Sequence, residues 1–160
     1  MIIGVMSDSH GKSHQVKKAI EIFDRENAAT IIHCGDVGGI EVFDEMVGRD
    51  AHFVWGNTDH PDQATFAYLN SVELAAPNSV PLSLEFGGKS IQVFHGHEPE
   101  FNQALRSPTS DYILHGHTHL ARDERIGNCR IINPGALHRA REYTIATIDL
   151  ERDEVTFHRL

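Results

Sequence analysis

The sequence is built from short apolar runs that each end in a polar segment rich in Asp, Asn, His and Gly. Five of these runs have the length of a β-strand: Ile2–Met6, Thr30–Ile32, His52–Trp55, Ile91–Phe94 and Tyr112–Leu114. The carboxyl ends of parallel strands meet at one edge of a sheet, so the polar segments are expected to converge there. This pattern favours an α/β fold whose polar side chains gather at one edge of one sheet.

Two segments between the first three runs have helical periodicity. The first is predicted to be capped by Ser13 and to extend to Glu26, and the second is shorter. Their apolar positions are Val16, Ala19, Ile20 and Phe23 in the first, and Ile40, Phe43, Met46 and Val47 in the second. Alternation of strand and helix predicts a parallel sheet with right-handed crossovers.

From Val80 onward the pattern changes to strands joined by turns, which predicts a second sheet. Gly87–Gly88 marks a hairpin, and Gly127–Asn128 marks a turn. Two of the runs named above are predicted to form the strands Ser90–His95 and Asp111–His115. The remaining predicted strands are Ser71–Ala76, Leu82–Phe86, Leu120–Ile126, Cys129–Ile132, Tyr143–Asp149 and Val155–His158, and the remaining predicted helices are Asp62–Leu69 and Phe101–Arg106. Since neither linkers nor repeats are visible, we expect one domain over residues 1–160, a two-sheet α/β sandwich flanked by helices.

The composition is that of an acidic globular protein, with a formal net charge of −9 and 40% hydrophobic residues. A field of that sign repels phosphate backbones, so broad nucleic-acid binding is not expected. No membrane span or basic leader is visible. The two cysteines, Cys34 and Cys129, have no zinc-knuckle spacing, which favours a reduced, cytoplasmic protein in which Cys34 fills a buried strand.

Carboxylate and imidazole donors recur at spacings that suit metal binding. Asp8 and His10 lie two residues apart, so on an extended segment both face the same side. His117 and His119 repeat this spacing, and Gly116 leaves the backbone open to close approach. Each pair alone is also compatible with a surface turn. We expect His115 to pack beside this loop rather than to bind a metal.

Two further strand ends supply oxygen donors. Asp36 has the glycine-flanked position expected of a carboxylate that bridges two ions, and Asn57 offers a neutral amide oxygen suited to a hard hydrolytic metal. Read alone, Asn57 is equally a turn residue. Suitable donor residues occur in five loops after five predicted strands, and chance does not explain the whole set.

Taken in order, these motifs resemble those of the calcineurin-like metallophosphoesterase superfamily. They are Asp8-x-His10, Gly35-Asp36, Gly56-Asn57, His95-Gly96-His97 and Gly116-His117-Thr118-His119. The short chain and Asn133-Pro134-Gly135 are similar to the small bacterial and archaeal phosphodiesterases of that superfamily. The resemblance implies a two-sheet sandwich flanked by helices, without a cap domain, and covers nearly the whole chain.

The resemblance also implies a dinuclear metal site and a reaction. Asp8, His10, Asp36 and His119 would hold one ion, and Asp36, Asn57, His95 and His117 would hold the other, with Asp36 shared. Manganese is expected, although nickel, iron, cobalt, zinc and magnesium also suit such donors. The activity implied is hydrolysis of a small or nucleotide-derived phosphodiester by metal-activated water, without a covalent phospho-enzyme.

The group that protonates the leaving alcohol is a departure from the family pattern. Many members carry His directly after the motif Asn, whereas this chain has Thr58, so Asp59 loses its usual partner. His60 and His97 are the candidates for that proton donor. The alternative is a substrate whose leaving group needs little protonation.

Two other functions fit the same motifs. One is a non-catalytic scaffold similar to the retromer subunit, and the other is a phosphomonoesterase or dinucleoside-polyphosphate hydrolase. No Arg-rich or aromatic cluster adjoins the motifs in sequence, so no base or sugar is indicated. Oligomeric state is not encoded visibly. The other histidines are expected to be surface or strand residues, with His14 closest to a bound phosphate: His14, His33, His52, His138 and His158.

Overall fold

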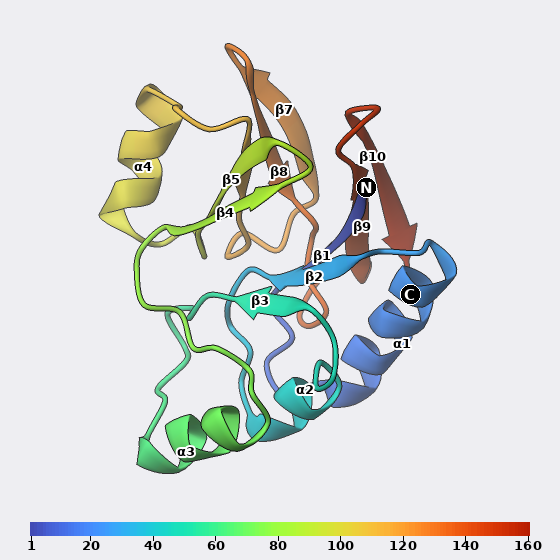
Figure 1. The fold of residues 1–160 in the computed structure, drawn as a ribbon, viewed down its shortest axis with the longest axis vertical. Coiled ribbons are helices and arrows are strands. Elements are labelled where there is room, and N and C mark those ends of the chain that lie inside the picture. Colours follow the sequence, from blue (N-terminus) through green and yellow to red (C-terminus); the bar gives the residue numbers. More distant parts are fainter.

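Two five-stranded sheets pack face to face, with helices outside them, in the computed structural model, which describes residues 1–160 (Figure 1). The first sheet has the order β10-β9-β1-β2-β3 and the second β4-β5-β6-β8-β7. The strands of the first are β1 (Ile2–Met6), β2 (Thr30–His33), β3 (Ala51–Phe53), β9 (Thr144–Asp149) and β10 (Glu154–Arg159). Those of the second are β4 (Leu82–Phe86), β5 (Lys89–Val93), β6 (Tyr112–Leu114), β7 (Arg122–Ile126) and β8 (Cys129–Asn133).

Each sheet has a parallel centre and antiparallel additions. β1, β2 and β3 run parallel, as do β5, β6 and β8, whereas β9, β10, β4 and β7 pair antiparallel to their neighbours. Between the sheets lies an apolar layer that includes Ile3, Val5 and Ile32 from the first sheet and Val93 and Leu114 from the second. This layer holds the carboxyl ends of the two parallel sets in fixed relation.

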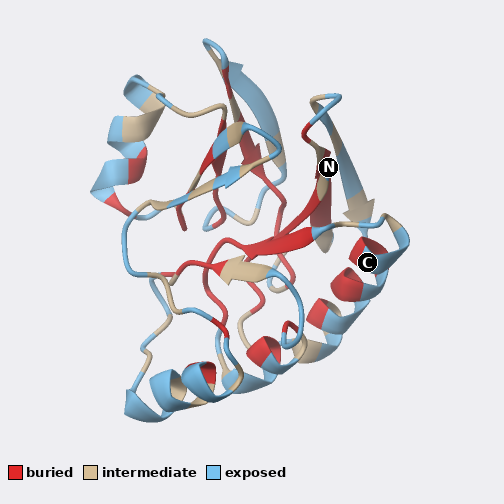
Figure 2. Ribbon diagram, viewed as in Figure 1, coloured by how far each residue is buried: buried red, intermediate tan, exposed pale blue.

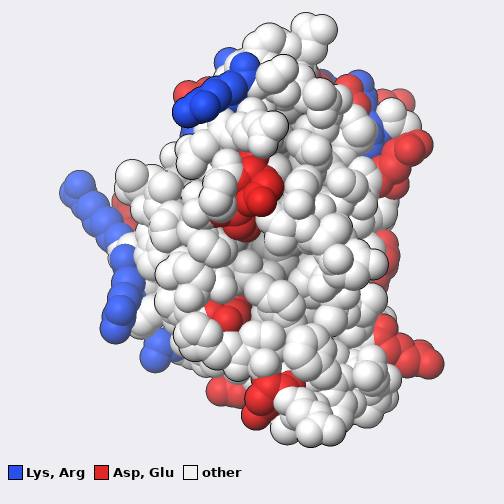
Figure 3. Space-filling model, turned by 90° about the vertical axis from the view of Figure 1, so that its left-hand side faces the viewer, with Lys and Arg blue, Asp and Glu red and all other residues white.

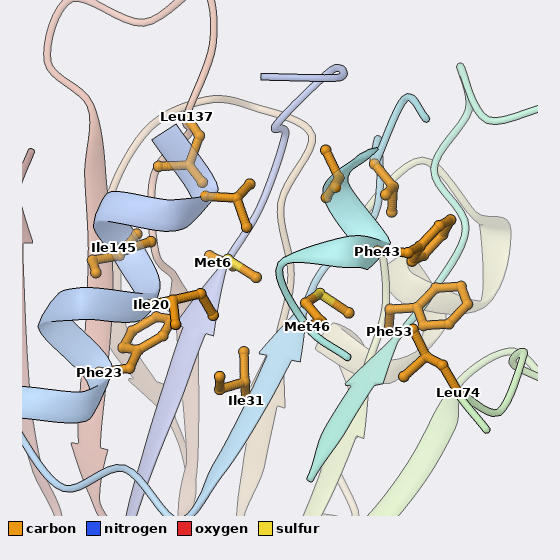
Figure 4. Packing of buried hydrophobic residues seen from close by; sticks show 14 of the residues in the cluster. Met6, Ile20, Phe23, Ile31, Phe43, Met46, Phe53, Leu74, Leu137 and Ile145 are labelled. Atoms are coloured by element: carbon orange, nitrogen blue, oxygen red, sulfur yellow. The ribbon is translucent and has the colours of Figure 1, made fainter. Parts of the chain in front are cut away.

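The helices cover the outer faces of the sandwich. They are α1 (Ser13–Arg25), α2 (Ile40–Asp44), α3 (Gln63–Ser71) and α4 (Pro99–Arg106). Figure 4 shows Ile20 and Phe23 of α1 against the first sheet, and Phe43 of α2 beside Phe53 of β3. α4 packs on the second sheet through Phe101. Each helix buries one side and leaves the other exposed (Figure 2).

The two-sheet fold without an inserted cap confirms the expected architecture, with differences at element ends. Ser13 was predicted to cap α1, which is wrong: it is the first helical residue, and Lys12 occupies the cap position without a side-chain hydrogen bond. β3 ends at Phe53, so Trp55 lies in the following loop. None of the four helices has the length and apolar character needed to cross a membrane.

The predicted strand Ser71–Ala76 is wrong. Ser71 is the last residue of α3, and Glu73 has a left-handed backbone with φ 57°. The Leu74 N–H donates to the Leu69 carbonyl (3.0 Å) and the Glu73 N–H to the Asn70 carbonyl (3.4 Å). This is the Schellman ending of a helix, in which the apolar residue after the left-handed position packs back on the last turn. The alternation of apolar residues that suggested a strand reflects this ending.

Candidate metal centre

The seven predicted ligands follow strand ends in both sheets. Three loops of the first sheet and two of the second carry them, so the prediction of one edge of one sheet is wrong. Asp8 and His10 follow β1, Asp36 follows β2, Asn57 follows β3, His95 follows β5, and His117 and His119 follow β6. The sheets face one another, and their parallel strands therefore deliver donors to a shared region from two sides.

The backbone at these loops adopts a conformation that ordinary residues avoid. Five of the seven predicted ligands have a left-handed φ between 45° and 69°: Asp8, His10, Asp36, His117 and His119. Such a conformation costs a non-glycine residue about 1 kcal/mol or more and tends to persist at functional sites. The backbone of these loops is thus strained at five of the predicted metal ligands.

The first group of donors is formed by Asp8, His10 and His119. One ligand atom from each lies within 4.8 Å of the others. His119 Nε2 is 3.2 Å from Asp8 Oδ1, and His10 Nε2 is 3.4 Å from Asp36 Oδ2. Asp36 therefore borders this group and connects it to the second.

The second group is formed around Asp36 and His95. Asp8, Asp36 and His95 have ligand atoms within 4.8 Å of one another, and Asp36 Oδ2 lies 3.5 Å from His95 Nε2. Asn57 Oδ1 lies 3.0 Å from both His95 Nε2 and His117 Nδ1. All seven predicted ligands are thus brought into one continuous cluster, in which Asp36 contacts His10 of the first group and His95 of the second.

Two unpaired atoms of the cluster indicate that a cation fits it. Asp8 Oδ1 and His10 Nε2 are buried and have no hydrogen-bond partner. Leaving a buried polar atom unpaired costs about 1–3 kcal/mol, which a divalent cation at this point would offset. The imidazole and carboxylate donors are also those that transition-metal ions accept. The residues present fit a metal centre.

Backbone carbonyls orient two histidines of the cluster, His95 and His119. His95 Nδ1 lies 2.8 Å from the Cys34 carbonyl, and His119 Nδ1 lies 3.3 Å from the Arg139 carbonyl. When Nδ1 donates to these carbonyls, Nε2 is left free to accept, as a metal ligand must. The buried Glu98 carboxylate accepts the N–H groups of His95 and Gly96, at 2.7 and 2.6 Å, and holds the loop after β5.

The two aspartates differ in their electrostatics. Burial raises the pKa of Asp8, although the Ser7 hydroxyl and the charges of His95 and His119 oppose the shift. Burial acts the same way on Asp36, but contacts from His95 and the Thr58 N–H outweigh it and hold the pKa of Asp36 below its usual range. A cation beside Asp8 would favour its ionised form in the same way.

The three predicted proton-transfer residues lie in different places. The Asp59 carboxylate accepts N–H groups from Val37 (3.1 Å), Gly38 (3.0 Å) and Gly56 (2.8 Å), so it joins the loops after β2 and β3. His60 is exposed and lines a pocket with Phe43 and Trp55, outside the donor groups.

His97 borders the cluster directly. Its ring centroid is 5.4 Å from that of His95 and 6.1 Å from that of His117, and its side chain is 38% exposed. Of the two histidines proposed as proton donor, His97 is the one whose ring packs against predicted ligands.

Two histidines that sequence reasoning treated as bystanders belong to the site's surroundings. His33 is fully buried, where its Nε2 lies 2.8 Å from Ser9 Oγ and its Nδ1 accepts the Gly35 N–H, so it braces the loops on either side. The His138 ring lies 5.4 Å from that of His10. His33 is the last residue of β2, as expected of a strand residue, but its place directly after an apolar run did not indicate the hydrogen bonds that it makes with two loops.

The loop after β6 rests on two buried polar residues. Asn133 donates to the Gly116 carbonyl (2.8 Å) and to Thr118 Oγ1 (3.1 Å), and these hydrogen bonds fix the loop that carries His117 and His119. His115 is buried against Phe101, with a ring-centroid distance of 4.7 Å, and belongs to neither donor group.

Burial of His115 predicts acid sensitivity. Burial lowers its pKa to about 4, so the folded protein keeps the ring neutral while the unfolded chain protonates it near pH 6.5. The contribution of the neutral His115 ring to the free energy of unfolding is complete above pH 6.5. It is lost as the pH falls toward 4, at about 1.4 kcal/mol per pH unit. Urea unfolding in chelator at pH 7 and pH 5 should therefore show a smaller pH-dependent loss for His115→Gln than for the wild type, by about 2 kcal/mol.

The matched control is His14→Gln, at an exposed position on α1. It should keep the wild-type pH dependence. An unaltered pH dependence in His115→Gln would contradict the assignment of a buried neutral ring.

Comparison with known proteins shows which family and fold this chain resembles. A family model described as the calcineurin-like phosphoesterase superfamily domain matches residues 1–153. A phosphodiesterase of Methanocaldococcus jannaschii is 31% identical over 159 residues, which cover 96% of each chain. The solved structure of an archaeal phosphodiesterase has a TM-score of 0.88 at 30% identity and covers 100% of both chains.

A more distant structure shows the fold alone. Vps29 of Entamoeba histolytica, solved in complex with zinc, has a TM-score of 0.68 at 17% identity and covers 100% of this chain and 98% of its own. The family match extends over nearly the whole sequence, and the archaeal relative exceeds 30% identity. This chain therefore belongs to the calcineurin-like phosphoesterase superfamily.

Proposed function

We propose that the protein hydrolyses small or nucleotide-derived phosphodiesters with the help of two divalent metal ions. The observation that carries the proposal is the single cluster of seven donors with unpaired buried atoms on Asp8 and His10. The phosphodiesterase activity named for the relative at 31% identity supports the choice of a diester.

The ligand assignment follows the two halves of the cluster. Asp8, His10 and His119 would hold one ion and His95, Asn57 and His117 the other, with Asp36 between them. Bound there, the ions would supply Lewis-acid activation of water and neutralise charge on the phosphoryl group. We propose manganese as the native metal, because mixed imidazole and oxygen donors suit it, and cytoplasmic action, because both cysteines are free.

His97 is proposed as the donor of the proton to the leaving alcohol. It is partly exposed beside His95 and His117, so a substrate seated on the cluster comes within its reach. Asp59 is proposed to position the loops that carry Asp36 and Asn57, since its carboxylate is occupied by three backbone N–H groups. His60 remains the alternative proton donor.

His97→Ala should slow cleavage of esters with poor leaving groups most. An alkoxide needs protonation, whereas a nitrophenolate leaves readily, so turnover of a dinucleotide should fall about a hundredfold and that of a nitrophenyl diester much less. Turnover rates for both substrates should be compared in His97→Ala and His60→Ala. The same selective loss in His60→Ala, with His97→Ala unaffected, would transfer the role to His60.

The scaffold alternative is less supported. The phosphodiesterase relative is 31% identical, whereas the resemblance to Vps29 is one of fold at 17% identity. All seven predicted ligand positions also carry side chains able to bind metal. A phosphomonoesterase or dinucleoside-polyphosphate hydrolase would use the same cluster, so substrate comparison must separate them.

The test is hydrolysis of a chromogenic phosphodiester beside its monoester. Protein stripped with chelator would be reloaded separately with manganese, nickel, zinc or magnesium. Metal-dependent turnover that favours the diester is expected. Turnover of the monoester alone would favour the phosphomonoesterase, and stoichiometric metal binding without turnover of either ester would favour the scaffold.

A further inference from the structure

We propose that three cations beside the metal cluster, Lys12, Arg139 and Arg141, bind a second phosphate carried by the substrate. This set is called the basic rim below. The inference rests on the proposed function and deepens it, because it assigns the substrate class: phosphodiesters in which one esterified group bears a further phosphate.

Arg141 lines the same pocket as His119, which is a member of the metal cluster. The pocket is lined by His119, Leu120, Arg141, Glu142 and Thr144, among others. Arg141 is exposed and has no carboxylate partner within ion-pair distance. The one carboxylate of this pocket, on Glu142, is paired with Arg159 at 3.0 Å. The Arg141 guanidinium therefore keeps its charge available beside a predicted metal ligand.

Arg139 and Lys12 approach the cluster from neighbouring loops. The Arg139 carbonyl lies 3.3 Å from His119 Nδ1, and Lys12 is two residues beyond His10. His138, the residue before Arg139, packs its ring against His10 at a centroid distance of 5.4 Å, so the chain around Arg139 borders both His10 and His119.

The arrangement runs against the overall charge of the chain. The formal net charge is −9, and half of the cations, seven of the 14 Lys and Arg residues, form ion pairs with carboxylates. All three members of the basic rim are among the other seven. On the face seen in Figure 3, acidic side chains lie near the centre and the lower edge, and basic side chains lie at the left edge and near the top.

The chemistry of the basic rim selects a phosphate. Guanidinium groups bind phosphate oxygens through paired N–H donors, and Lys adds a point charge. The scissile phosphate would lie on the cluster itself, so an anion at the basic rim must be a different group of the same molecule. A dinucleotide with a terminal phosphate has this form.

The test compares thymidine dinucleotides that carry no terminal phosphate, a 5′-phosphate or a 3′-phosphate. Wild-type kcat/KM should be about tenfold higher for one of the phosphorylated forms than for the unphosphorylated one, and added salt should reduce this ratio. Arg141→Glu should bring the ratio close to one. The control Arg25→Glu makes the same change in net charge at the far end of α1 and should keep the wild-type ratio.

The outcomes separate this inference from the proposed function. Cleavage of all three dinucleotides at equal rates, with no effect of Arg141→Glu on the ratio, would overturn the basic rim and leave the phosphodiesterase intact. Failure to cleave any of them or the chromogenic diester would overturn the proposed function. A preference lost equally in Arg25→Glu would reduce the effect to general charge and would also overturn the inference.

Discussion

Asp36→Ala is expected to lower kcat/KM for a phosphodiester by at least about a thousandfold, which corresponds to about 4 kcal/mol of transition-state stabilisation. Asp36 Oδ2 lies 3.4 Å from His10 Nε2 and 3.5 Å from His95 Nε2, so its carboxylate faces both halves of the cluster. Removing it takes a shared oxygen donor from both proposed ions. The measurement is metal-dependent turnover, together with metal content after dialysis.

The control for this variant is Asp50→Ala. Asp50 directly precedes β3, at the end of the strand away from the loop that carries Asn57, and its side chain is 56% exposed. Turnover and metal content should match the wild type. Wild-type turnover in Asp36→Ala would contradict the proposed metal centre, provided that circular dichroism shows both variants folded.

Gly116→Ala should also disable the site, although the residue carries no chemical group. A Cβ there would lie 1.9 Å from Ser7 Oγ and 2.6 Å from Asp8 Oδ2. Ser7 and Asp8 are fully buried at the end of β1, so neither can move freely away. Displacing the Asp8 carboxylate by a fraction of an ångström should cost about a hundredfold in turnover, and the overpacking about 1–3 kcal/mol in stability.

Gly127→Ala is the matched control for Gly116→Ala. Gly127 lies in the turn between β7 and β8 with φ 60°, and a Cβ there meets nothing within 4 Å. Its backbone strain should cost about 1–2 kcal/mol of stability without changing turnover. Equal turnover in both alanine variants would show that Asp8 is not held by Gly116.

The strand ends were predictable from sequence because the signal is local. An apolar run followed by Gly, Asp or His marks both the end of a strand and the loop that carries a donor, as at Asp8 and Asp36. The meeting of two sheets at the cluster was not predictable in this way. It depends on the packing of residues such as Val5 and Val93, which are far apart in the chain.

The misread segment after α3 and the overlooked cations have related causes. Val72 and Leu74 alternate with polar residues as in a strand, but the hydrogen bond of Leu74 to Leu69 decides the structure, and only the folded helix shows it. Arg139 and Arg141 are some twenty residues from His119 in sequence and come beside it because β8 and β9 return the chain to the cluster.

The most direct test of the metal centre is X-ray diffraction from crystals of the protein loaded with manganese, recorded where the metal scatters anomalously. Two anomalous peaks are expected, one beside His10 and His119 and one beside His95 and His117, with Asp36 next to both. Crystals that contain manganese but show no peak among these residues would contradict it.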